Sequence, residues 1–280
     1  SRTNGIPEEI DAIIPRDKLY ERTGIQSQVY NTIYQLYSVK KTSDDLDKAQ
    51  RWLMLAEYFN FLLTGVKMNE YTNCSTTGLL NAKTHDFDAE LLDRLGIPKK
   101  IFGTPQKPGT VVGRLKKEIM EETGLDLSVV LPATHDTGSA VMSVPTTEPC
   151  VYISSGTWSV MGILSKEPIT HEKSMAGGFS KEGAYDGSIR FLKNIMGLWI
   201  VQSIRRDLNK KYTFDEMCDM ARNSKYTGEI DVNDASFLAP DNMIDAIREY
   251  LAKHNQPAPE GIEDVLCTAY NSLAKSYAQT

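Results

Sequence analysis

Metal-ligating residue types are scarce in this sequence of 280 residues. It has four cysteines and four histidines, all far apart: Cys74, Cys150, Cys218, Cys267, His85, His135, His171 and His254. Structural zinc sites need closely spaced pairs of such ligands, and no CxxC pair is present. We therefore predict no metal site built from side chains. Cysteines this sparse are typical of a reducing compartment, so we expect a cytoplasmic protein.

Signals for membranes and nucleic acids are also missing. No apolar run approaches the roughly 20 residues that span a bilayer, and we expect no signal peptide. The formal net charge is −6 and the isoelectric point is about 5.4, which is opposite to the basic surface that binds nucleic acids or anionic lipids. We predict neither kind of partner. The composition leaves the oligomeric state open.

The length and composition fit one large globular domain or two of ordinary size. Hydrophobic residues make up 41% of the chain and charged residues 24%, which is typical of soluble proteins. Pro145 and Pro149 stand close together and interrupt any regular element. We place a domain junction there and predict domains at 1–146 and 147–280.

Strand and helix patterns alternate, which indicates an α/β fold. A turn at 108–109 leads into a short strand that ends near Leu115, and a helix at 116–123 ends at Gly124. Apolar spacing and capping residues predict further helices at 42–64, 87–95, 212–223, 241–253 and 262–279. Strand, helix and strand in this order have a βαβ-like rhythm.

One polar stretch, LPATHDTG at Leu131–Gly138, stands between a strand and a helix. The apolar run Leu127–Leu131 predicts a buried strand, and Ser139–Ser143 can open a helix. Asp136 is therefore expected where a strand ends and a helix begins, a usual place for a ligand site. Its carboxylate is equally suited to capping that helix, and both roles are compatible.

This stretch resembles the HDT motif of the rhamnulokinase group in the FGGY family of carbohydrate kinases. Further stretches resemble the same pattern in the same order: YNTIYQL at 30–36, the helix at 55–65, EYTNCSTT at 70–77, YISSGTWSVMG at 152–162 and LKNIMGLWIVQ at 192–202. The resemblance covers essentially the whole chain. It implies a two-domain sugar-kinase architecture with an actin/hexokinase-like ATPase fold, present here in part.

Three of these stretches have structural interpretations beside the functional ones. Tyr30, Ile33 and Tyr34 form an apolar helix face, although the resemblance makes Tyr30 and Asn31 candidates for sugar contact. The hydroxyl residues of EYTNCSTT are expected to cap and bond local backbone. Cys74 within them is expected to be a small buried residue rather than a nucleophile.

The segment at 150–162 predicts a hairpin whose turn offers amides and hydroxyls to a phosphate. It has no Walker A signature, and an ordinary hairpin fits the pattern as well. A helix is predicted from Arg190 to about Leu208, in which Asn194 and Gln202 are polar residues in an apolar run. The resemblance implies that Thr157 and Gln202 face ATP and that Asn194 lines the site.

The implied reaction transfers the γ-phosphoryl group of ATP, with Mg²⁺, to a hydroxyl of a ketose, and the resemblance favours L-rhamnulose giving L-rhamnulose 1-phosphate. Asp136 would be the base, His135 and Thr137 would hold the sugar, and the site would lie in the cleft between two domains. Alternatives are a kinase of another sugar and a non-catalytic sugar-binding derivative.

The family's first phosphate loop would precede Ser1, its adenine-binding segment would follow Thr280, and Arg2 matches the arginine of a D-x-R motif whose aspartate would lie before Ser1. We therefore expect an internal fragment that is inactive alone.

Overall fold

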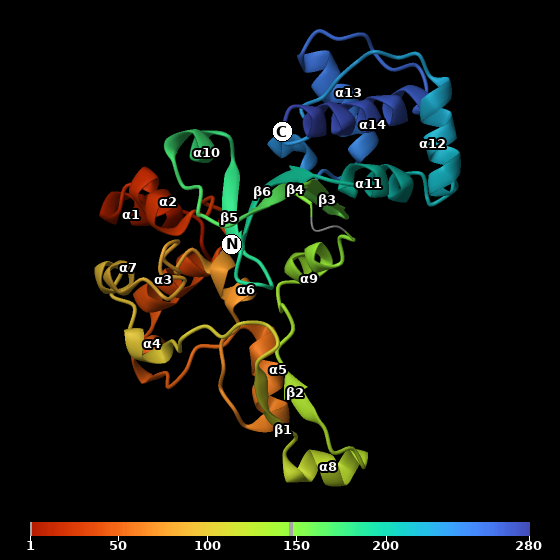
Figure 1. Ribbon diagram of the computed structural model, residues 1–280. Coiled ribbons are helices and arrows are strands. Elements are labelled where there is room, and N and C mark those ends of the chain that lie inside the picture. Colours follow the sequence, from red (N-terminus) through yellow and green to blue (C-terminus); the bar gives the residue numbers. More distant parts are fainter. Residues whose placement is uncertain (1, 146–147) are drawn as a thin grey trace. The chain divides into compact units, whose positions relative to one another are not determined.

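The computed structural model describes residues 2–145 and 148–280, which form helices and two β-sheets (Figure 1). They divide into two compact units, Ser1–Tyr152 with Gly162–Leu192 and Ile153–Met161 with Lys193–Thr280. Thr146 and Thr147, in the predicted domain junction, lie outside the described residues, and the junction stays a prediction. No helix in the described ranges is both long enough and apolar enough to cross a membrane.

The first unit is built mainly from short helices, and its main apolar core lies among those of residues 6–101. The helices of this unit are α1 (Ile6–Ile13), α2 (Arg16–Thr23), α3 (Thr32–Thr42), α4 (Asp45–Lys48), α5 (Leu55–Thr64), α6 (Tyr71–Cys74), η1 (Ser75–Thr77), α7 (Ala89–Arg94), η2 (Lys99–Ile101), α8 (Lys117–Thr123), α9 (Asp136–Met142) and α10 (Glu172–Ala176). Ile10, Ile33 and Leu91 are at most 1% exposed in this core. The predicted helices at 87–95 and 116–123 are confirmed, and Gly124 adopts the left-handed conformation that ends α8.

The helix predicted over 42–64 is wrong in its middle. The chain leaves helical geometry after α4 and resumes it at α5, because two interactions compete with a continuous helix. The amide of Trp52 donates to the carbonyl of Ile101 at 2.8 Å, and its ring packs against Phe87 and Phe102. The carboxylate of Glu57 accepts from the amide of Met54 at 2.9 Å, which starts α5 anew.

Strands β1 (Val111–Arg114) and β2 (Ser128–Val130) pair antiparallel. The βαβ-like rhythm predicted here is therefore wrong as a guide to pairing, since that unit joins parallel strands. The predicted burial of the second strand is also wrong: Leu127 is 51% and Val130 is 46% exposed. A two-stranded sheet whose strands contact α5 leaves its remaining surface to solvent.

The second sheet has the strand order β3-β4-β6-β5. Its strands are β3 (Val151–Ser155), β4 (Trp158–Ser165), β5 (Phe179–Gly183) and β6 (Ile189–Met196). The predicted hairpin is confirmed as β3 and β4, with the amide of Gly156 donating to the carbonyl of Trp158 at 3.0 Å. The helix predicted from Arg190 is wrong over 190–196, because these residues belong to strand β6. Buried residues are consecutive at both ends of β6, Ile189 with Arg190 and Ile195 with Met196, so the alternation that distinguishes a half-buried strand from a helix is absent.

The second unit packs its helices around a separate apolar core. They are α11 (Trp199–Asp207), α12 (Phe214–Asn223), η3 (Ala235–Phe237), α13 (Met243–Lys253) and α14 (Ile262–Ala278). Phe237, Ile247 and Leu266 are fully buried in this core. The helices predicted at 212–223, 241–253 and 262–279 are confirmed, and a capping box of Thr213 and Glu216 starts α12.

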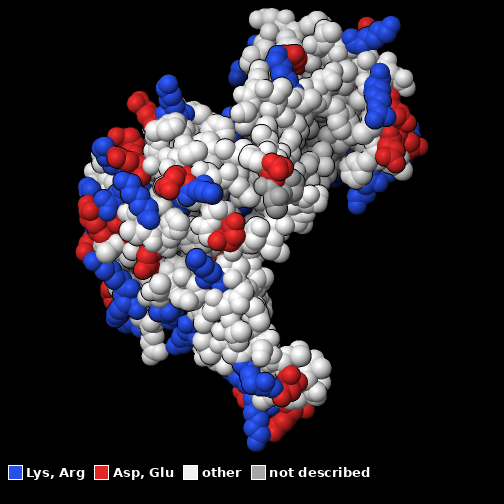
Figure 2. Space-filling view, viewed as in Figure 1, with Lys and Arg blue, Asp and Glu red and all other residues white. Residues whose placement is uncertain are grey.

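Acidic and basic side chains are interspersed on the visible face of the molecule (Figure 2). Several form pairs across helix surfaces, such as Lys41 with Glu9 at 2.6 Å and Lys117 with Glu121 at 3.6 Å. Mixed signs of this kind give little long-range field and add little stability, since exposed ion pairs are worth at most about 1 kcal/mol.

Candidate functional site

The start of α9, with the residue that precedes it, carries three of the predicted site residues. Helix α9 begins at Asp136, so the prediction that this residue starts a helix is confirmed. His135 is the N-cap residue, and Asp136 occupies the first helical position, where its Oδ1 accepts from the amide of Thr137 at 2.6 Å. The Asp136 side chain is 97% exposed, whereas that of His135 is 25% exposed. The carboxylate therefore projects from a segment that is otherwise partly buried.

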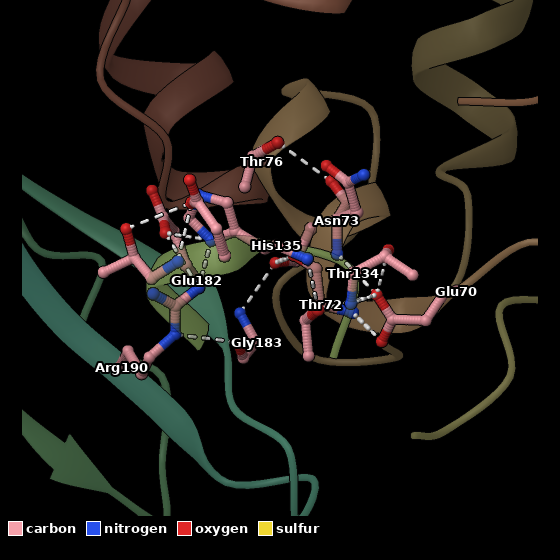
Figure 3. A network of polar contacts seen from close by, with 12 residues as sticks. Glu70, Thr72, Asn73, Thr76, Thr134, His135, Glu182, Gly183 and Arg190 are labelled. Atoms are coloured by element: carbon pink, nitrogen blue, oxygen red, sulfur yellow. Dashed lines mark hydrogen bonds and ion pairs between the residues drawn. The ribbon is translucent and has the colours of Figure 1, made fainter. Parts of the chain in front are cut away.

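A buried carboxylate holds this segment from the side of α6 (Figure 3). Glu70 is fully buried and caps α6, accepting from the amides of Thr72 at 2.7 Å and Asn73 at 3.0 Å. Its Oε2 also accepts from the amide and the hydroxyl of Thr134, at 3.1 and 2.7 Å. The amide of His135 donates to the hydroxyl of Thr72 at 3.3 Å. Glu70 thus joins two segments that are 64 residues apart.

A buried ion pair holds the His135 ring from the side of the second sheet (Figure 3). The guanidinium of Arg190, which is fully buried, donates to the carboxylate of Glu182 at 3.0 Å and to the carbonyl of Gly183 at 3.0 Å. Arg190 Nη2 also lies 2.7 Å from His135 Nδ1. Burial lowers the pKa of His135, and the positive charge of Arg190 lowers it further, against the raising effect of Glu182.

The turn between β3 and β4 carries a second predicted cluster, in the second unit. The carbonyl of Thr157 accepts from the amide of Trp199, at 3.1 Å, at the start of α11. The hydroxyl of Thr157 reaches the side-chain oxygen of Gln202 at 3.5 Å. A Cβ at Gly197 would lie 2.6 Å from the amide nitrogen of Ser159, so only glycine permits this close approach.

The structure therefore brings the predicted residues together in two groups. His135, Asp136 and Thr137 are consecutive at the start of α9, and Thr157 contacts Gln202. Asn194 is exposed on strand β6, not on the predicted helix. The described ranges contain no group of three or more His, Cys, Asp or Glu residues arranged to hold a metal ion.

The structure also shows where Tyr30, Tyr34 and Cys74 lie. Tyr34 is a core residue at 1% exposure, as predicted, whereas Tyr30 is 61% exposed beside Asn31, the N-cap residue of α3. Cys74 is fully buried, and burial raises the pKa of its thiol well above the usual range, which suits a packing role.

Sequence reasoning missed Glu70, Glu182 and Arg190. Glu70 was interpreted only as part of a run of capping residues, and Arg190 only as the start of a helix. The available signal was the charged pair Lys181 and Glu182 a few residues before Arg190, which stands between Ile189 and Phe191, since buried charges in proteins are paired.

Comparisons with known proteins agree with one another. The sequence model of the N-terminal domain of the FGGY family of carbohydrate kinases matches residues 1–143, and that of the family's C-terminal domain matches residues 151–280. A rhamnulokinase of Oceanobacillus iheyensis is 46% identical over 279 residues, which are 99% of this chain and 59% of that protein. A rhamnulokinase of Bacillus subtilis is 35% identical, again over 99% of this chain and over 57% of its own length. The chain thus spans less than two thirds of these relatives.

Two solved structures have a similar fold. A xylulose kinase from Lactobacillus acidophilus matches 97% of this chain and 56% of its own, with a TM-score of 0.72 and 19% identity. A Plasmodium falciparum glycerol kinase with ADP matches 81% of this chain and 47% of its own, with a TM-score of 0.68 and 14% identity. The predicted α/β sugar-kinase architecture, with its actin/hexokinase-like ATPase fold, is confirmed.

Replacement of Glu70 tests whether its carboxylate holds the two segments together. In Glu70→Gln, the amide NH₂ must face at least one backbone N–H, so a hydrogen bond to a charged acceptor is lost and a buried donor is unpaired. We expect the free energy of unfolding to fall by about 1.5–3 kcal/mol, measured by denaturant titration. Glu122→Gln on the exposed surface of α8 serves as the control. An unchanged stability of Glu70→Gln would contradict this role.

We expect the free energy of unfolding to depend on pH because of Lys181, which is next to Glu182 on β5. Burial lowers its pKa from 10.5 to about 8, so the unfolded chain holds this proton more tightly. The penalty for burying the charge is complete below pH 8 and disappears above pH 10.5. Lys181→Met should therefore be the more stable protein at pH 7, by up to about 3 kcal/mol, and lose this advantage between pH 8 and 10.5.

Unfolding free energies of Lys181→Met and of the unsubstituted protein, measured across this pH range, check the expectation. The exposed Lys166 provides the matched variant, Lys166→Met, for which the pH-dependent difference should be absent. A difference that stays constant with pH in Lys181→Met would show that Lys181 has an ordinary pKa.

Proposed function

This chain belongs to the FGGY family of carbohydrate kinases, and we propose that the protein containing it transfers the γ-phosphoryl group of ATP to L-rhamnulose, giving L-rhamnulose 1-phosphate. The observation that carries the proposal is the exposed carboxylate of Asp136 beside the partly buried ring of His135, which Arg190 holds by a hydrogen bond. The choice of sugar rests on the curated relatives, which are rhamnulokinases.

Asp136 is proposed as the base that accepts the proton of the attacking hydroxyl. A base must come within hydrogen-bond reach of that hydroxyl, which requires an accessible carboxylate on a fixed support. The exposure of Asp136 supplies the access, and the bonds to Thr134 and His135 supply the support. His135 and Thr137, on either side in the sequence, are proposed to bind sugar hydroxyls.

Thr157 and Gln202 are proposed to face the nucleotide, and Asn194 to line the substrate site. The β3–β4 turn offers the hydroxyl of Thr157 and exposed backbone at 155–158, and Gln202 offers an amide. Such neutral donors suit phosphate oxygens. Mg²⁺ is proposed to accompany ATP and to neutralise phosphate charge. It needs few protein ligands when phosphates and water complete its shell, which fits the lack of a group of three or more His, Cys, Asp or Glu ligands among the described residues.

Two parts of the proposal concern organisation and location. We assign residues 1–146 and 147–280 to the N-terminal and C-terminal domains of the family, with the boundary in the Pro145–Pro149 segment. The location is proposed to be the cytoplasm, where free cysteines such as Cys150 remain reduced.

Asp136→Asn tests the assignment of the base. The amide cannot accept the proton, so kcat for ketose phosphorylation should fall by roughly 10²- to 10⁴-fold, with little change in KM for the sugar. ADP release is measured with a chain that contains these residues and has the length of the relatives. Asp215→Asn, in the first turn of α12, removes an exposed carboxylate from a similar helix position and should have full activity.

A panel of ketoses completes this assay. Preference for L-rhamnulose supports the whole proposal, and preference for another ketose would replace the substrate but keep the chemistry. Full activity of Asp136→Asn would refute the role of Asp136. Absence of turnover on every sugar would favour a non-catalytic sugar-binding protein.

A further inference from the structure

Arg190 donates hydrogen bonds in three directions from a fully buried position. Its Nε bonds the carbonyl of Gly183 at 3.0 Å, and its Nη2 bonds Glu182 at 3.0 Å and His135 Nδ1 at 2.7 Å. These partners account for both protons on Nη2. Two groups on β5 thus fix the position and direction of the guanidinium independently of the histidine.

A guanidinium fixes where the proton of a neighbouring imidazole lies. Arginine has five N–H donors, has no acceptor and stays protonated in proteins. A 2.7 Å contact between Arg190 Nη2 and His135 Nδ1 is therefore a hydrogen bond only if Nδ1 is the acceptor. Glu182 Oε2 lies farther from Nδ1, at 3.4 Å, and already accepts from Arg190. The neutral ring then carries its proton on Nε2.

The opposite edge of the ring faces the proposed base. His135 Nε2 lies 3.9 Å from Asp136 Oδ1, and the Asp136 side chain is 97% exposed. The backbone of His135 is held separately, by the bond from its amide to Thr72. A Cβ at Gly138 would lie 3.6 Å from Arg190 Nη2, so the first turn of α9 packs directly against the guanidinium. The guanidinium of Arg190 therefore supports both the His135 ring and the start of α9.

We infer that Arg190 is a positioning residue that holds His135 in the tautomer protonated at Nε2, so that this N–H donates to a substrate oxygen beside Asp136. The inference rests on the proposed function for its substrate, but the tautomer itself follows from the contacts of Arg190. A fixed donor selects a sugar with an acceptor oxygen at this point. An analogue that lacks this oxygen leaves the N–H unpaired and is rejected.

The groups around the ring keep it neutral. Four charged residues act on His135: Arg190 on β6, Glu182 on β5, Asp136 on α9 and Glu70 at the start of α6. Burial and Arg190 lower the pKa of His135, and the three carboxylates oppose them. The balance is a lowered pKa, which leaves one ring proton at neutral pH.

The first test measures the ¹⁵N chemical shifts of the two ring nitrogens of His135 in the unsubstituted protein. Histidine is labelled with ¹⁵N, and the signals of His135 are assigned by their loss in His135→Gln. We expect Nδ1 to resonate as an unprotonated nitrogen and Nε2 as a protonated one at pH 7.5. A protonated Nδ1 would overturn the inference, and this result requires neither a substituted arginine nor any activity.

The second test separates positioning from general structural support. In Arg190→Gln the cation beside the ring is lost, so the pKa of His135 rises and the acid limb of kcat/KM for the sugar moves to higher pH. KM for the sugar should rise by about tenfold or more, as expected for loss of an aligned donor, while KM for ATP stays unchanged. Arg190→Lys keeps the charge, so its acid limb should lie nearer to that of the unsubstituted protein.

Arg22→Gln is the matched control, because Arg22 pairs with Asp88 at 2.8 Å in the same compact unit. It should leave the pH profile unchanged. Equal losses of activity in both Arg190 variants without movement of the acid limb would assign Arg190 a structural role only. Absence of turnover in the unsubstituted protein would refute the proposed function, while the nitrogen spectrum would still decide the tautomer.

Discussion

The start of α9 depends on a single constraint, the need to pair buried charges. Glu70 and Arg190 are both fully buried, and each would destabilise the fold strongly if it had no partner. Glu70 satisfies its carboxylate with backbone amides and hydroxyls from two segments. Arg190 satisfies most of its guanidinium with Glu182, Gly183 and His135. The segment at 134–136 lies where these two sets of bonds meet, so its geometry is fixed from both sides.

Because of this arrangement, the neighbouring residues His135 and Asp136 have different roles. His135 is held at its amide by Thr72 and at its ring by Arg190. Asp136, one position later, has a side chain that is almost fully exposed and bonds only locally, to Thr137. A catalytic carboxylate needs access to substrate, and a binding group needs a defined direction. The buried network supplies direction without covering the carboxylate.

Sequence reasoning predicted helix starts and turns better than it predicted segments whose structure depends on contacts with distant residues. It placed Asp136 at a helix start and Thr157 in a hairpin turn, because turn residues and capping residues act locally. It failed on β6, where buried residues follow one another directly, Ile189 with Arg190 and Ile195 with Met196, so the alternation of a half-buried strand is absent. It also failed between α4 and α5, where a hydrogen bond from Trp52 to Ile101 interrupts the helix. That bond joins residues 49 positions apart, and no local pattern contains it.

Glu182 and Arg190 were missed for the same reason. Their role depends on the ion pair that they form with each other on neighbouring strands, which no local pattern contains. Stability alone does not explain such a pair: a buried ion pair can often be replaced by apolar residues with no loss of stability. An apolar pair at 182 and 190 would leave His135 Nδ1 without its donor and leave the ring free to take either tautomer. The buried charges of Glu182 and Arg190 are therefore best understood as a means of directing one imidazole proton. Apolar packing can hold the ring in place, but it cannot determine that the ring proton is on Nε2, the nitrogen that faces Asp136.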